Sequence, residues 1–172
     1  MIRQCDIAIV GAGMAGASLA AELEGRASVL LLEAESTPGY HATGRSAAFW
    51  TESYGGPGVQ PLTTASGRYL RDGGFLRPRT ALTIARAGQE GALDRFAAGF
   101  AALGVRVEVL ERAALEQWIP GLRPGWARGA LEPDCCDIDV AGLHQHYLAR
   151  ARRAGATLLC SARLAAARRR AA

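Results

Sequence analysis

Short apolar runs alternate with small residues in the first part of the chain. Residues 6–10 form a run rich in β-branched side chains, which predicts a buried parallel strand. The glycine-rich stretch 11–16 follows directly, and the small residues of 17–24 predict a helix. A second apolar run, 28–33, ends on the acidic Glu33. This order of strand, turn, helix and strand predicts a right-handed βαβ unit with two parallel strands.

The rest of the chain predicts alternating helices and strands after an irregular segment over 34–44. Helices are expected where apolar residues recur at helical spacing, and strands where they alternate or cluster. The expected helices cover 45–53, 57–71, 90–103, 112–118 and 140–154, and the expected strands cover 80–85, 105–110, 129–132 (as an edge strand) and 157–160. The closing helix and strand indicate a return to the first sheet, so we expect an α/β fold of Rossmann type.

The glycine-rich stretch has the spacing GxGxxG, in which each glycine has a physical role. Gly11 permits the tight turn, Gly13 lets a pyrophosphate approach the backbone, and Gly16 allows close packing of helix on strand. The helix N-terminus offers N–H groups and a partial positive charge to the pyrophosphate. Glu33, twenty residues beyond Gly13, is placed to accept hydrogen bonds from an adenosine ribose and disfavours a 2′-phosphate. The turn predicts FAD or NAD as ligand, the alternative being a structural turn beside a surface Glu.

The segment after Glu33 favours FAD over NAD. Residues 38–48 read Pro-Gly-Tyr-His-Ala-Thr-Gly-Arg-Ser-Ala-Ala, where a nicotinamide dehydrogenase usually continues into another helix and strand. A turn at 44–46 is expected to open a small-residue helix, which gives further backbone donors beside a guanidinium. Such donors suit the extra charge and length of FAD. The small Ala47 and Ala48 would allow a flat ring to lie against the backbone.

At these residues the sequence resembles the family of FAD-dependent D-amino-acid oxidases and dehydrogenases, which includes glycine and sarcosine oxidases. Within it, the D-arginine dehydrogenases are the most similar group. The resemblance runs through 38–48, 54–55, 137–139 and 143–148. It implies FAD contacts at Gly11, Gly13, Met14, Ala15, Gly16, Glu33, Ala34, Thr43, Gly44, Arg45, Ser46, Ala47, Ala48 and Leu164, with Tyr54 on the substrate side of the flavin.

The resemblance also implies a reaction, in which a hydride passes from the α-carbon of an amino acid to the flavin. The resulting imino acid hydrolyses to a 2-oxo acid, and the electrons pass to oxygen or to a quinone. Two departures weaken a specificity for D-arginine. Phe49 stands where those enzymes carry His, and neither Thr80 nor Ala81 supplies a carboxylate for a substrate guanidinium. A neutral or apolar small-molecule amine substrate is therefore expected.

The family's two-domain design implies an interleaved, incomplete chain. Residues 1–75 are expected to form the FAD-binding core and the flavin-contacting segment, 76–135 a partial α+β substrate domain, and 136–172 a return to the FAD-binding domain. Family members are considerably longer, so we expect an N-terminal portion that is inactive alone and binds FAD poorly. Two alternatives stay open: a dinucleotide-binding module or subunit that needs a partner chain, and an NAD-dependent oxidoreductase.

Charge and composition change this interpretation little. The net charge is +4, but the seven Arg of 150–172 account for the excess, and 1–149 carry thirteen Arg against sixteen acidic residues. This mildly acidic body offers no basic surface for nucleic acid. No apolar run is long enough for a membrane span, and Asp6 interrupts any signal-peptide core. With four irregularly spaced cysteines, the expected location is the cytoplasm, or the periphery of the inner membrane if a quinone accepts the electrons.

The remaining polar candidates receive structural interpretations. His41 is expected to form a loop-stabilising hydrogen bond, and His144 and His146 to be surface or packing residues. The acids Asp134, Asp137 and Asp139 favour a turn and a helix cap, because the spacing and the glycine of a calcium loop are missing. No metal site is expected.

Overall fold

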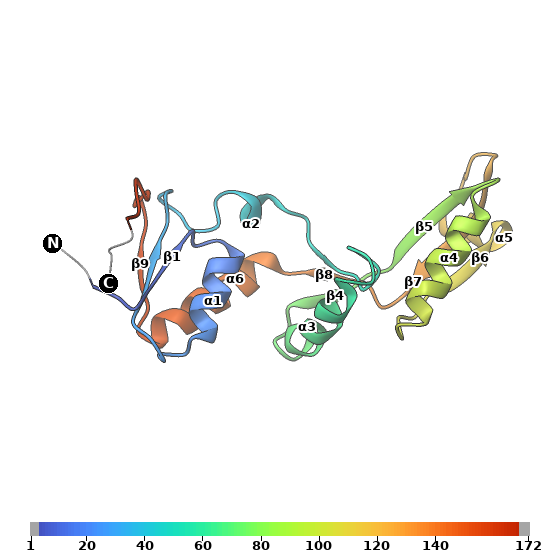
Figure 1. Ribbon diagram of the computed structural model, residues 1–172. Helices are drawn as coiled ribbons and strands as arrows, with labels where there is room; N and C mark the ends of the chain where they lie inside the picture. The colour runs from blue at the N-terminus through green and yellow to red at the C-terminus, as the bar shows by residue number, and fades with distance from the viewer. Residues whose placement is uncertain (1–3, 169–172) are drawn as a thin grey trace. The chain divides into compact units, whose positions relative to one another are not determined.

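The computed structural model describes residues 4–168 and divides into two compact units. Unit 1 comprises residues 1–47 and 139–172, and unit 2 comprises residues 48–138 (Figure 1). The last four residues of the basic end lie outside the described residues. The chain thus leaves unit 1 once and returns to it, and the assignment of 1–75, 76–135 and 136–172 to cofactor and substrate domains stays a prediction.

Unit 1 is built on a three-stranded parallel sheet in the order β1-β2-β9. The strands are β1 (Ile7–Val10), β2 (Val29–Leu32) and β9 (Thr157–Leu159). The predicted βαβ unit and the predicted return of the chain to the first sheet are both confirmed.

Two helices, α1 (Met14–Glu22) and α6 (Val140–Arg153), cover one face of this sheet (Figure 1). The face of α1 toward the core is made of alanines, which lets α6 pack close beside it. Leu31 of the sheet and Leu148 of α6 are the largest side chains that this core buries completely.

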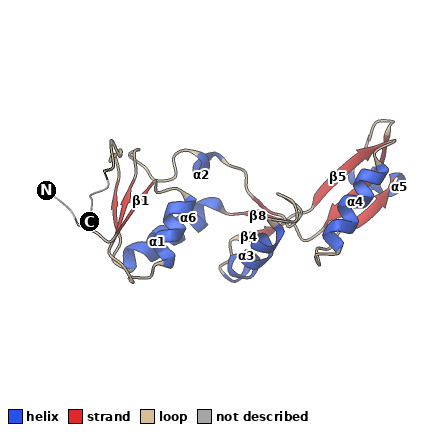
Figure 2. Ribbon diagram, in the orientation of Figure 1, coloured by secondary structure: helices blue, strands red, loops and turns tan. Residues whose placement is uncertain are grey.

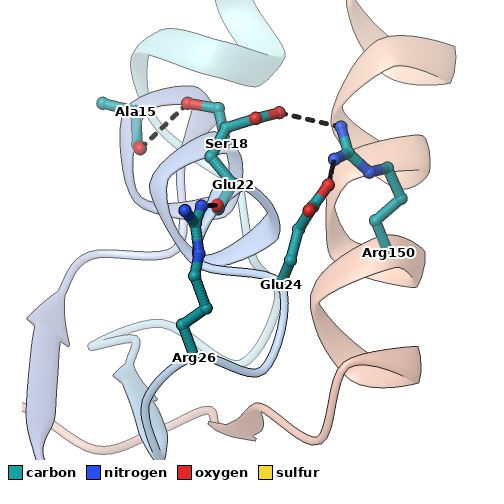
Figure 3. A network of polar contacts seen from close by, with 6 residues as sticks. All are labelled: Ala15, Ser18, Glu22, Glu24, Arg26 and Arg150. Atoms are coloured by element: carbon teal, nitrogen blue, oxygen red, sulfur yellow. Dashed lines mark hydrogen bonds and ion pairs between the residues drawn. The ribbon is translucent and has the colours of Figure 1, made fainter.

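An arginine joins the two helices of unit 1 at the surface. The Arg150 guanidinium donates to Glu22 Oε1 and to Glu24 Oε1, each at 2.8 Å (Figure 3). Both carboxylates lie at the end of α1, so this ion-pair cluster connects that end to the last turn of α6.

Unit 2 contains two antiparallel sheets of three strands. The first has the order β3 (Phe49–Trp50), β8 (Cys136–Ile138) and β4 (Leu76–Pro78). The second has the order β5 (Ala81–Arg86), β7 (Trp126–Glu132) and β6 (Glu108–Glu111). The helix α3 (Gln60–Asp72) follows β3 in the chain, and the Trp50 indole of β3 donates to the Thr63 carbonyl at 2.8 Å. Figure 2 shows α4 (Glu90–Ala101) lying along the second sheet. The helix α5 (Arg112–Trp118) follows β6 directly in the chain.

Two expectations about the elements are wrong. The predicted helix over 45–53 is absent, because α2 (Ala42–Arg45) ends where that helix was to begin and Ser46 is extended. Phe49 and Trp50 instead pair with β8. The strand predicted at the edge over 129–132 is the central strand β7, hydrogen-bonded to β5 on one side and to β6 on the other.

Two further strands were not predicted. β4 and β8 have three residues each, and β8 consists of Cys136, Asp137 and Ile138, which form no apolar run. Within residues 4–168, none of the helices combines the length and the apolar character needed to cross a bilayer.

Candidate functional site

The glycine-rich turn joins β1 to α1 at the carboxyl end of the sheet. Gly11 has a φ of +94°, which favours glycine, and its N–H donates to the Leu32 carbonyl at 2.7 Å. A Cβ on Gly16 would lie 2.0 Å from the Gly11 carbonyl oxygen and 3.2 Å from Ile9 Cγ2. Any side chain at Gly16 would push α1 away from β1, which is the role expected for the third glycine.

The first turn of α1 is suited to an anion. The first N–H groups of a helix have no intrahelical acceptor and carry a partial positive charge. Acidic residues are absent from this turn, and Ala15 is exposed. The Met14 N–H donates to Thr43 Oγ1 at 2.9 Å, and the same hydroxyl lies 3.0 Å from where a Cβ on Gly13 would be. The absence of a side chain at Gly13 therefore leaves room for Thr43, and Thr43 brings the 38–48 segment to the turn.

Glu33 lies directly after β2, and 8% of its surface is exposed. Its Oε2 accepts from the Ala12 N–H and its Oε1 from the Glu35 N–H, both at 3.0 Å. Burial acts to raise the pKa of this carboxyl, but hydrogen bonds from backbone N–H groups, chiefly those of Glu35 and Ala12, outweigh it. The pKa of Glu33 therefore lies below its usual range, and the group is an anion at neutral pH.

The 38–48 segment is folded tightly against itself. A Cβ on Gly44 would lie 2.6 Å from the Gly39 carbonyl oxygen, so the two glycines allow the chain to double back. The Ser46 hydroxyl donates to the Ala42 carbonyl at 2.5 Å, and the Arg45 guanidinium lies over the Tyr40 ring at 4.7 Å. The prediction that the 44–46 turn opens a helix is wrong, because α2 ends at Arg45. Ser46 therefore does not lie in the first turn of a helix and supplies no N–H donor there.

The structure brings most of the predicted cofactor residues to one end of unit 1. The turn, Glu33 and Thr43 are joined by the hydrogen bonds above. The chain after β9 also runs beside Glu33, because the Ala162 N–H donates to the Glu33 carbonyl at 2.7 Å. Leu164 follows in this stretch and is 47% exposed. Tyr54 belongs to unit 2, and 78% of its surface is exposed, so it is not a core residue of that unit.

One residue of this end of unit 1 was missed as a functional candidate. His144 of α6 is buried, and its Nε2 lies 2.8 Å from the Ala12 carbonyl oxygen. Its expected packing position is confirmed, but the contact with the turn spans 132 residues of sequence and has no local signal.

Two smaller expectations are confirmed in unit 1. His41 Nε2 hydrogen-bonds Glu35 Oε1 at 3.0 Å, which is the expected loop contact. Asp139 caps α6, because its side chain accepts from the Gly142 N–H at 2.8 Å.

Unit 2 has a buried carboxylate of its own, also missed from the sequence. Glu132, the last residue of β7, accepts from Thr51 Oγ1 at 2.9 Å, from Ser53 Oγ at 2.5 Å and from the Glu52 N–H at 2.6 Å. Burial and, next, the charge of Glu132 raise the pKa of the Cys135 thiol. The three hydrogen bonds to Glu132 fix residues 51–53, which directly precede Tyr54.

Comparison with known proteins places this chain among flavoproteins. A family model described as FAD dependent oxidoreductase (DAO) matches residues 6–172. The solved structure of NikD, described as an unusual amino acid oxidase essential for nikkomycin biosynthesis, is 26% identical, with a TM-score of 0.75 over 93% of this chain and 44% of that chain.

Two further solved structures are less than 25% identical and show the fold alone. Glycine oxidase from Geobacillus kaustophilus is 23% identical, with a TM-score of 0.76 over 93% of this chain and 47% of that chain. L-alpha-glycerophosphate oxidase from Mycoplasma pneumoniae, with FAD bound, is 16% identical, with a TM-score of 0.81 over 93% of this chain and 45% of that chain. This chain therefore spans less than half the length of each of these proteins.

Proposed function

The chain belongs to the FAD dependent oxidoreductase family, and from this premise we propose that it is the N-terminal portion of an enzyme that oxidises the Cα–N bond of an amino acid. Its cofactor is FAD. The observation that carries the proposal is the arrangement at the carboxyl end of the unit 1 sheet. There an anionic Glu33 and an acid-free helix N-terminus flank a turn without side chains at Gly11 and Gly13.

These features fit the adenosine diphosphate half of FAD. In the proposed complex the pyrophosphate lies against Gly13, Met14, Ala15 and Gly16, and Glu33 accepts hydrogen bonds from the ribose hydroxyls. The Glu33 carboxylate already accepts hydrogen bonds from two backbone N–H groups, and its oxygens have further lone pairs that can accept from additional donors. The other proposed contacts are Gly11, Ala34, Thr43, Gly44, Arg45, Ser46, Ala47, Ala48 and Leu164.

Bound FAD supplies the acceptor for the hydride that leaves the substrate α-carbon. The proposed role of this chain's own residues is to bind the cofactor and to orient the substrate. The exposed Tyr54 is proposed to face the substrate, on a segment that Glu132 holds in place. The substrate is proposed to be a D-amino acid or glycine-like amino acid with a neutral side chain, because Thr80 and Ala81 offer no negative charge. The electron acceptor is proposed to be oxygen or a quinone.

The share of its relatives that the chain covers favours a second candidate. A non-catalytic dinucleotide-binding module, or a subunit that acts with a partner chain, would need only the residues of unit 1 described above. The nicotinamide alternative has no such support, because the family match specifies FAD.

Ligand titration of the 172-residue chain tests the binding site. We expect FAD and ADP to compete, with weak affinities, and FMN not to displace ADP. ADP carrying a 2′-phosphate should bind about tenfold more weakly than ADP, because its charge approaches Glu33. In Glu33→Gln this discrimination should shrink. Competition by FMN, or equal binding of the two ADP forms, would contradict the proposed placement.

The reaction is tested on a polypeptide that contains this chain and has the length of its relatives. Under anaerobic conditions, D-alanine or D-leucine should reduce the bound flavin and yield the corresponding 2-oxo acid and ammonia. D-arginine should reduce it much more slowly. Equal rates for D-arginine and D-leucine would contradict a neutral substrate, and no reduction by any amino acid would favour the binding module.

A further inference from the structure

His144 lies between the two segments proposed to hold FAD, although it belongs to neither. It projects from α6, and 4% of its surface is exposed. Its Nε2 is 2.8 Å from the Ala12 carbonyl oxygen in the middle of the GxGxxG turn. A carbonyl oxygen only accepts hydrogen bonds, so Nε2 carries the proton of this contact. In the neutral ring, Nδ1 is then unprotonated.

The other edge of the ring faces the 38–48 segment. A Cβ on Gly39 would lie 2.8 Å from His144 Cε1 and 3.1 Å from Nδ1. Gly39 also has a φ of +79°, so two independent features require a glycine there. The imidazole occupies the space that any other residue at position 39 would fill with its side chain.

The Ala12 peptide is held from both sides. Its N–H donates to Glu33 Oε2 at 3.0 Å, and its carbonyl accepts from His144. Ala12 itself is completely buried. The path of the turn between Gly11 and Gly13 is therefore fixed by one side chain from the end of β2 and one from α6.

We propose that His144 is a positioning residue for the dinucleotide: its ring holds the Gly11–Gly16 turn and the Gly39–Thr43 segment in the arrangement that places their N–H groups and hydroxyl against the pyrophosphate. This inference rests on the proposed function, because FAD is the ligand concerned. The contact between Met14 N–H and Thr43 Oγ1 is the direct product of that arrangement. His144 acts on the ligand only through these two segments.

Two variants at this position separate the hydrogen bond from the bulk of the side chain. His144→Leu keeps a bulky side chain in the buried site but removes the hydrogen-bond donor to the Ala12 carbonyl. His144→Gln retains an N–H donor near the position of Nε2. Gln145→Leu, an exposed neighbour on the same helix, serves as the matched control.

The first readout is amide hydrogen exchange of Ala12 and Met14 in the chain without ligand, together with the tautomer of His144 by imidazole nitrogen NMR. The second is the dissociation constant for ADP. We expect His144→Leu to speed exchange at both amides and to weaken ADP binding about tenfold. His144→Gln should restore most of both properties, and Gln145→Leu should match the unsubstituted chain.

Unchanged exchange and unchanged ADP affinity in His144→Leu would overturn the proposal. The proposal would also be overturned if both variants lost ADP affinity and amide protection equally, in proportion to a lowered unfolding midpoint. That pattern would describe a purely structural residue. If the unsubstituted chain binds no ADP, the proposed placement of the dinucleotide on this chain fails. The exchange and tautomer measurements would still decide whether His144 holds the turn.

Discussion

Each unit of the molecule contains one buried carboxylate at the end of a strand, and the two differ in what surrounds them. Glu33 follows β2 in unit 1 and is held by two backbone N–H groups. Glu132 ends β7 in unit 2 and is held by two hydroxyl groups and one N–H. Both are satisfied, as buried charges must be.

The difference lies in the partners of each group. Glu33 borders the N-terminus of α1 and the glycine-rich turn, where we propose that the dinucleotide binds. Glu132 accepts from three consecutive residues, 51–53, and fixes that segment to the end of a central strand. We therefore propose that the groups facing a buried carboxylate, and not its own chemistry, decide whether it serves binding, as at Glu33, or architecture, as at Glu132.

The largest expected effect comes from the tightest backbone approach in unit 1. Gly16→Ala places a Cβ 2.0 Å from the Gly11 carbonyl oxygen, so the backbone of the turn or of α1 would have to move. We expect unit 1 to lose about 4 kcal/mol or more of its free energy of unfolding. Amide hydrogen exchange in β1 and β2 measures this loss.

The matched control is Gly99→Ala in α4 of unit 2, where nothing lies within 4 Å of an added Cβ. This change should stabilise unit 2 by up to about 1 kcal/mol, because alanine favours helix. All three tryptophans lie in unit 2, so their fluorescence follows that unit separately. Equal stability of Gly16→Ala and the unsubstituted chain would show that the turn is not closely packed.

Glu132→Ala should have the next largest effect. It leaves two hydroxyls and an N–H without their acceptor, which we expect to destabilise unit 2 by about 2–4 kcal/mol. Urea unfolding followed by tryptophan fluorescence measures the loss. Glu132→Gln, which keeps one acceptor oxygen, should lose less, and neither variant should change ADP affinity. A tenfold loss of ADP affinity would abolish the distinction between the two carboxylates.

Glu33→Gln should have a smaller effect on stability, about 1–2 kcal/mol at neutral pH, because the amide oxygen still accepts one N–H. The pKa of Glu33 is lowered in the folded chain, so on acidification the unfolded chain binds the proton first. The stability that the carboxylate contributes is present above the usual Glu pKa of about 4.3 and is lost as pH falls through the lowered value. Hydrogen exchange of unit 1 should therefore show that the stability difference between the unsubstituted chain and Glu33→Gln shrinks as the pH falls. A difference that grows with acid would contradict the lowered pKa of Glu33.

Arg150→Met should have the smallest effect. Its two carboxylate partners are mostly exposed, and such pairs contribute about 1 kcal/mol or less. Methionine keeps the apolar stem of the side chain in place. Thermal unfolding in low and high salt should show a small difference that salt removes. A loss that persists in high salt would mean that packing, and not charge, is the contribution of Arg150.

The position of Glu33 at the end of the second strand was predicted from the sequence, whereas the buried position of Glu132 was not, for a physical reason. Glu33 belongs to a local βαβ unit, in which strand, turn and helix fix its distance from the glycines. Glu132 meets donors 79 to 81 residues away along the chain, and His144 meets Ala12 at a separation of 132. Contacts of that kind leave no periodicity in the sequence.

The same contrast explains the errors in the elements. The parallel strands of unit 1 are short apolar runs and were recognised, whereas β8 has no apolar run and takes its place through pairing with β3 and β4. The helix expected over 45–53 failed because Phe49 and Trp50 pair with β8, an interaction that helical propensity does not represent.

The most direct test of FAD binding at the glycine-rich turn is an amide NMR titration of the chain with FAD. We predict shifts at residues 11–16, 33–34 and 43–48, with none in the β5–β7–β6 sheet, and their loss in Glu33→Gln at the same FAD concentration. Shifts confined to unit 2, or shifts in unit 1 that are indifferent to Glu33, would contradict the proposed site.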